Sequence, residues 1–149
     1  MLAPMMTPQD VRLVQESFAA VEPIADTAAA LFYARLFELD PSLRPLFRRD
    51  MKTQGNRLMH ILGVAITGLD DLSALVPVVE QLGKRHAAYG VRPEHYTTVA
   101  EALLWTLQTG LGPAFTPSVR DAWVNVYGLL AGTMQRGAAY SDDAYASAA

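Results

Sequence analysis

The amino-acid sequence predicts an all-α protein, and three observations lead to this prediction. Apolar residues recur at the three- and four-residue spacing of a helix face, as in Val11, Val14, Phe18 and Val21. No segment alternates between apolar and polar residues as a half-buried strand does. Prolines and glycines divide the chain into about seven helical segments.

Length and composition restrict the possible classes of protein. The 149 residues suit a single domain, 1–149, with a helical core from about 7 to 137. Apolar residues make up 51% and charged residues 18%, which suits a core built around a cofactor, or a homodimer interface. The net charge of −3 without a basic block argues against a nucleic-acid partner. No signal peptide, membrane-length apolar run or cysteine occurs, so we expect a cytoplasmic protein without disulfides.

Helix-start signals place the elements of the first half. Thr7 and Pro8 begin the first helix as its cap and first residue. A second helix, from about 23 to 39, is apolar over most of its circumference and should lie deep. Residues 41–46 form a short helical piece, and a long helix follows from about 51 to 69.

The second half contains the histidine on which the chemistry depends. Residues 72–77 form a turn or short helix that leads into a helix ending in His86, with Gly90 as a left-handed stop. The stripe of this helix is Leu75, Val78, Val79, Leu82 and His86. Pro93 begins the next helix and Thr116-Pro117 the last one. The tail 138–149 has no stripe and should fray.

His86 has two interpretations. A histidine that ends an apolar stripe is either a core residue bonded to a carbonyl or a ligand for a group inside the core. Gln54 and Leu58 lie on an apolar helix face about thirty residues earlier, and Phe47 and Tyr33 precede them. Tyr33 could equally be a core tyrosine bonded to a carbonyl, and Gln54 a solvated residue.

Five motifs, in this order and at these spacings, resemble those of the globin family, in particular bacterial single-domain globins and the globin domain of flavohaemoglobins. They are Leu31 to Phe37, Arg44 to Phe47, Gln54 to Leu58, Gly83 to Tyr96 with His86 and Tyr89-Gly90-Val91, and Asp121 to Gly128. The resemblance covers roughly Thr7 to Met134.

The resemblance implies a three-over-three helical fold around haem b, with His86 as the ligand of the iron. It implies that Phe47 packs on the haem and that Tyr33, Gln54 and Leu58 form the distal pocket. Leu82, Val91, Tyr96 and Arg57 are the other residues that we expect at the cofactor. His60, six residues after Gln54, should point elsewhere.

The resemblance also implies reversible binding of O₂ and of other diatomic ligands, CO and NO. Dioxygenation of NO is then a possible enzyme activity, and it would need an external reductase because the chain ends at Ala149. Flavohaemoglobins bond the proximal histidine to a tyrosine and a glutamate. Tyr96 matches the tyrosine, but Ala138 stands in the place of the glutamate.

Two other functions stay open. One is a haem-based gas or redox sensor, or an electron-transfer globin, in which a distal side chain binds the resting iron. The other is a globin fold that has lost haem and acts through partners, against which His86 and Phe47 argue.

Overall fold

The computed structural model describes residues 6–47 and 49–148, and side chains through residue 139. Within these residues there is no strand, which confirms the predicted all-α class. The α-helices are α1 (Pro8–Val21), α2 (Ala25–Leu39), α3 (Met51–Thr67), α4 (Leu72–Ala88), α5 (Pro93–Leu111) and α6 (Pro117–Ala148). Four short 3-10 helices connect them: η1 (Glu22–Ile24), η2 (Pro41–Leu46), η3 (Gly68–Asp70) and η4 (Gly112–Ala114).

Polar caps fix the starts of three helices. The Thr7 hydroxyl accepts from the Asp10 N–H at 3.1 Å, and the Asp10 carboxylate accepts from the Thr7 N–H at 3.0 Å, so the predicted start of α1 is confirmed. Asp50 caps α3 by accepting from the Thr53 N–H at 3.0 Å. Asp71 caps α4. These bonds satisfy N–H groups that have no partner inside the helix.

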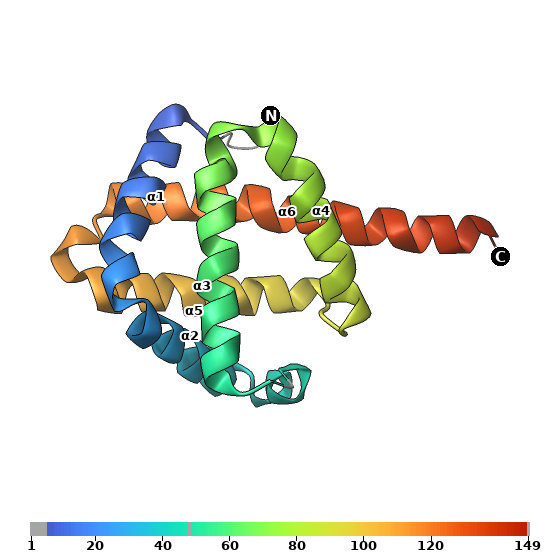
Figure 1. The fold of residues 1–149 in the computed structure, drawn as a ribbon, viewed down its shortest axis with the longest axis horizontal. Coiled ribbons are helices and arrows are strands. Elements are labelled where there is room, and N and C mark those ends of the chain that lie inside the picture. The colour runs from blue at the N-terminus through green and yellow to red at the C-terminus, as the bar shows by residue number, and fades with distance from the viewer. Residues whose placement is uncertain (1–5, 48, 149) are drawn as a thin grey trace.

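Three boundaries differ from the sequence-based expectation. Residues 72–77 are neither a turn nor a separate helix, because the Asp71 cap makes them the start of α4 and Pro77 lies inside it. Pro23 lies in η1, so α2 begins at Ala25. The backbone of α6 continues to Ala148 and extends beyond the helical body in Figure 1. The predicted fraying of 138–149 stays a prediction.

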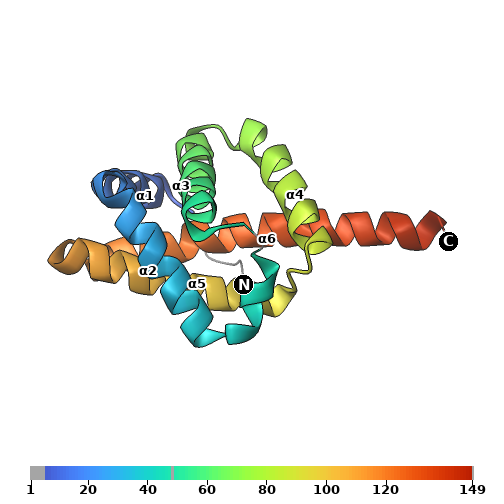
Figure 2. The same ribbon diagram turned by 60° about the horizontal axis from the view of Figure 1, so that its bottom comes forward.

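The helices form two crossing layers. Figure 2 shows α1, α3 and α4 on one side of α2, α5 and α6. The most extensive packing joins α4 to α6, α2 to α5 and α1 to α6. Side chains from four of these helices form the centre of the core and are at most 1% exposed: Val14, Leu36, Ala102, Ala122 and Val126.

Consecutive helices α3 and α4 hardly contact each other within the described residues. Helix α3 packs on α1 and α2, whereas α4 packs on α6, and the two are well separated in Figures 1 and 2. Among the described residues, no helix is both long and apolar enough to cross a membrane. The arrangement therefore separates the helix of Gln54 and Leu58 from the helix of His86.

Candidate functional site

His86 lies in the last turn of α4 and is half-buried. Its Nδ1 is 2.9 Å from the main-chain oxygen of Leu82. A carbonyl oxygen only accepts hydrogen bonds, so Nδ1 carries the proton and Nε2 keeps a lone pair. Burial lowers the pKa of His86, and the nearby positive charge of Arg85 lowers it further. The hydrogen bond to Leu82 acts in the opposite direction and raises this pKa. A neutral imidazole with a free Nε2 is the form that binds a metal ion.

The end of α4 fixes the backbone of His86. Gly90 has φ +99°, the left-handed conformation that glycine adopts without strain, as predicted for this stop. The Val91 N–H donates to the His86 carbonyl at 3.0 Å, and the Gly90 N–H donates to that of Ala87 at 3.1 Å. These bonds anchor the chain directly after the histidine.

Two glycines bring α4 unusually close to α6. A Cβ built at Gly83 would lie 2.6 Å from the Met134 Cα, and one built at Gly137 would lie 2.8 Å from the Glu80 Cα. Real Cβ atoms do not approach a backbone this closely, so only glycine fits at either position. The contact sets the height of α4, and of His86, above α6. Sequence reasoning missed it, although a helical glycine three residues before the histidine was a signal.

Tyr33 reaches from α2 towards α3. Its side chain is 7% exposed, and its hydroxyl donates to the main-chain oxygen of Gln54 at 3.3 Å. The bond to a carbonyl is the one expected of a core tyrosine, and it also places Tyr33 beside Gln54. Burial raises the pKa of Tyr33 to about 12, so the phenol stays protonated and remains a donor at neutral pH.

A close helix crossing allows this contact. A Cβ built at Gly55 would lie 3.0 Å from the Cβ of Ala29, so a larger side chain at either position would force α2 and α3 apart. Gly55 directly follows Gln54 and is itself buried. The two small residues therefore bring Tyr33 to the backbone of α3.

Aromatic rings surround Tyr33. Phe47 meets it edge to face at 5.2 Å between ring centroids, and Phe32 does so at 5.1 Å. Phe37 stacks on Tyr33 at 5.9 Å and meets Phe47 at 5.5 Å. Such pairs stabilise each other beyond the burial of their area. The structure thus brings Phe47 against Tyr33 and places Tyr33 beside the main chain of Gln54, and the cofactor roles of these residues stay predictions.

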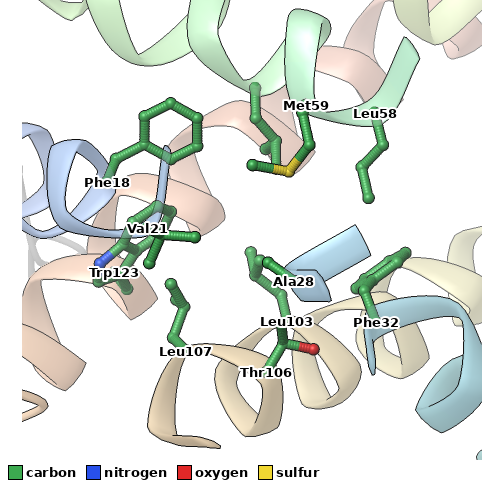
Figure 3. A pocket seen from close by; sticks show the side chains of 11 residues that line it. Phe18, Val21, Ala28, Phe32, Leu58, Met59, Leu103, Thr106, Leu107 and Trp123 are labelled. Atoms are coloured by element: carbon green, nitrogen blue, oxygen red, sulfur yellow. The ribbon is translucent and has the colours of Figure 1, made fainter. Parts of the chain in front are cut away.

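Gln54 and Leu58 are half-buried on α3, while His60 is exposed, as expected. Leu58 also borders a small internal cavity of about 20 Å³. Figure 3 shows Leu58 and Met59 pointing from α3 towards Leu103 and Leu107 of α5. The other residues that line it are Phe18, Val21, Ala28, Phe32, Leu62, Thr106 and Trp123. The Thr106 hydroxyl donates to the Ala102 carbonyl at 2.8 Å, so its bond is satisfied within α5.

Of the remaining predicted residues, Leu82 lies on α4, Val91 and Tyr96 follow the end of that helix, and Arg57 lies on α3. Leu82, Val91 and Tyr96 are half-buried, and Arg57 is exposed. The Tyr96 carbonyl accepts from the Tyr127 hydroxyl at 2.6 Å, a contact that the sequence did not suggest. Among the described residues His86 bonds to Leu82, and no hydrogen bond joins it to the Tyr96 side chain. The cofactor roles of these four residues stay predictions.

Comparison with known proteins assigns the chain to a family. A family model described as Globin matches residues 30–134. The chain belongs to the globin family. Neuroglobin of Tetraodon nigroviridis is 34% identical over 146 residues, which cover 89% of this globin and 92% of the relative. A flavohemoprotein of Bacillus subtilis is 31% identical over 130 residues, which cover 85% of this globin but only 33% of the flavohemoprotein.

Solved structures share the fold. One is described as an engineered carbene transferase and presumed nitric oxide dioxygenase of Rhodothermus marinus. It superposes with a TM-score of 0.84 at 28% identity, covering 95% of this globin and 99% of that chain. A tardigrade hexacoordinated haem protein superposes with a TM-score of 0.79 over 89% of this globin and 94% of its own chain. At 17% identity it shows the fold alone.

Haem is the cofactor of this globin, as membership of the family implies. The residues present fit that group. The neutral His86 leaves Nε2 free, and the helix that carries it, α4, packs on α6. Imidazole is the ordinary axial ligand of a gas-binding haem. Apolar side chains from α3 and α5 suit the porphyrin, as Leu58, Leu103 and Leu104 illustrate.

Proposed function

We propose that this globin binds O₂ reversibly, and CO and NO as well, with His86 as the protein ligand of the haem iron. The observation that carries the proposal is the hydrogen bond from His86 Nδ1 to the Leu82 carbonyl. This bond orients the ring and leaves Nε2 as the ligand atom. We infer that Tyr33 of α2 and Gln54 of α3, which meet through the Tyr33 hydroxyl and the Gln54 main-chain oxygen, form the distal side.

When bound, the haem supplies the iron at which a diatomic gas is held. Tyr33 and Gln54 are the proposed distal donors, from a phenol and a side-chain amide, and Tyr33 would exchange its bond to the Gln54 carbonyl for one to the ligand because a phenol has one proton to donate. Each hydrogen bond would contribute about 0.5–1.5 kcal/mol, or up to about tenfold in affinity. Leu58 places an apolar group beside them and limits the access of water.

The proposed reaction is dioxygenation of NO. NO takes up both atoms of O₂ and one electron to give nitrate, and the electron comes from a reductase on another chain. The similarity to a flavohemoprotein and to the Rhodothermus marinus structure supports this chemistry. His86 bonds to a neutral carbonyl and residue 138 is alanine, so the imidazole is less anionic than one bonded to a carboxylate.

Visible absorption spectra of the ferric, ferrous and ferrous–CO forms test the assignment of His86. We expect the parent to purify with haem, and His86→Gly to lose most of it unless imidazole is added to fill the space of the missing ring. His60→Gly, which changes an exposed histidine on α3, is the matched control and should keep the parent spectra. Parent-like spectra of His86→Gly without imidazole would show that another residue binds the iron.

A second candidate is a sensor or electron-transfer globin whose resting iron binds a distal side chain. Gln54 favours it, because its half-buried side chain has no hydrogen-bond partner among the described residues. The ferrous spectrum separates the two functions: an open gas binder is five-coordinate, and the alternative is six-coordinate. If Gln54 binds the resting iron, Gln54→Leu would change the ferrous spectrum from six-coordinate to five-coordinate.

A further inference from the structure

A surface groove lies between α2 and α3, on their outer side. Its volume is about 510 Å³, within the range of small-molecule sites. The residues that line it are Asp26, Ala29, Ala30, Tyr33, Ala34, Phe37, Arg44, Met51, Lys52, Gly55 and Asn56. His86 does not line the groove, and neither do the residues of the small cavity; of the residues expected at the haem, only Tyr33 lines it.

Small and aromatic residues make the floor of the groove apolar. Three alanines of α2, at positions 29, 30 and 34, leave space that larger side chains would fill. The rings of Tyr33 and Phe37 stack at an interplanar angle of 27° and extend this floor. An apolar chain can therefore lie along α2 against alanine and aromatic carbon.

Cationic groups lie at one end. The Arg44 guanidinium lies over the Phe37 ring, 5.1 Å from its centroid, and one of its nitrogens is 3.1 Å from the Met51 sulfur. Lys52 lines the same groove. Neither Arg44 nor Lys52 forms an ion pair with a carboxylate among the described residues. Stacking orients the guanidinium, and its remaining N–H groups suit a carboxylate.

The acidic residue that lines the groove, Asp26, lies far along α2 from the cationic end. Asp26 stands eleven positions before Phe37 on α2, which is roughly 16 Å along the helix. The sequence around the cationic end is basic although the chain has net charge −3. Residues 44–57 hold five of the twelve lysines and arginines and one acid, Asp50, which caps α3. The groove lining itself holds two cations, Arg44 and Lys52, and one acid, Asp26, so the end with the cations favours an anion.

We propose that the groove binds an amphipathic carboxylate, of the class of medium-chain fatty acids. The carboxylate pairs with Arg44 and Lys52, and the apolar chain lies on the alanines, Tyr33 and Phe37. The cations at one end and the apolar floor together favour this class, because the carboxylate can pair with Arg44 and Lys52 while the chain covers the floor.

Calorimetric titration of the ferrous–CO holoprotein with decanoate tests the proposal. In the CO form the iron is already occupied, so binding of the carboxylate to the metal cannot contribute to the measured heat. We expect saturable binding of one decanoate and none of decyltrimethylammonium, which has the same chain and the opposite charge. Arg44→Gln and Lys52→Gln should each weaken binding about tenfold, the loss of one charge-assisted hydrogen bond.

Two further variants keep the result interpretable. Ala30→Phe fills the floor without changing charge and should abolish binding. Arg120→Gln removes an exposed cation from α6, outside the groove, and should leave the affinity unchanged. Equal binding of decyltrimethylammonium, full affinity in Arg44→Gln with Lys52→Gln, or no binding to the parent would each overturn the proposal.

Tyr33 connects the groove to the gas site, and this link rests on the proposed function. A chain bound on the groove side contacts the ring of Tyr33, whose hydroxyl we place beside the diatomic ligand. Decanoate should therefore shift the C–O stretching frequency of the ferrous–CO parent, but not that of Tyr33→Phe. Binding without any shift would refute the link and leave the carboxylate site standing.

Discussion

Tyr33 contacts the backbone of α3, three aromatic rings and the outer groove through one side chain. As a hydrogen-bond donor it should slow the loss of O₂. We predict that Tyr33→Phe and Gln54→Leu each increase the O₂ dissociation rate, by up to about tenfold. Stopped-flow replacement of O₂ by CO measures this rate.

A matched control is available in Tyr127→Phe. That side chain is half-buried and its hydroxyl also donates to a carbonyl, but the carbonyl belongs to Tyr96 on α5. It should leave the O₂ dissociation rate at the parent value. A parent-like rate in the double variant of Tyr33 and Gln54 would remove both residues from the distal role.

The raised pKa of Tyr33 leads to a second prediction, which concerns how the stability of the protein depends on pH. Burial raises its pKa from 10.0 to about 12, so between these values the native state holds a proton that the unfolded chain has lost. The free energy of unfolding should therefore fall as pH rises from 10 towards 12, and the full contribution is present below pH 10. Urea unfolding across this range should show a smaller fall in Tyr33→Phe than in the parent. An equal fall in both proteins would contradict the assignment.

At the scale of the elements, the crossing of α4 and α6 depends on two glycines. We predict that Gly83→Ala and Gly137→Ala each lower the free energy of unfolding by about 1–3 kcal/mol, because each new methyl group meets a backbone that must move. Denaturant unfolding of the holoprotein measures this loss. Displacement of α4 should also move His86 and shift the iron–histidine stretching band in the ferrous Raman spectrum.

Gly128→Ala is the control for this prediction. Gly128 lies in the same helix α6, and a Cβ built there has nothing within 4 Å. The substitution should raise the free energy of unfolding by about 0.5–1 kcal/mol, since alanine loses less entropy in a helix. If all three variants behaved alike, the close crossing would not be a feature of the folded protein.

At the scale of the whole molecule, the proposed haem site draws residues from two helices, α3 and α4, that hardly contact each other among the described residues. In contrast, α1, α5 and α6 pack on one another. Haem bound as we propose would contact both helices and would stabilise their folded positions by mass action. We predict that removal of haem increases amide hydrogen exchange in α4 and the first half of α3, more than in α1, α5 and α6. Uniform exchange across all helices would contradict this.

The sequence by itself determined the all-α class, most helix positions and the order of the motifs around His86. Local patterns suffice for these, because capping residues and apolar spacing act within one helix. The stop at Gly90 followed from its backbone freedom alone. One boundary was wrong: residues 72–77, predicted as a turn or short helix, form the start of α4 because Asp71 caps that helix.

Only the tertiary structure decided which groups from different helices meet. The bond between Tyr33 and the Gln54 carbonyl requires the close approach of Ala29 and Gly55. The Gly83–Met134 contact likewise requires α6 to cross α4 at that turn. Val78 shows the limit of the helix stripe: it shares the spacing of the buried residues, yet it is 52% exposed. Spacing along a helix fixes the direction of a side chain, but only the packing of other helices decides what covers it.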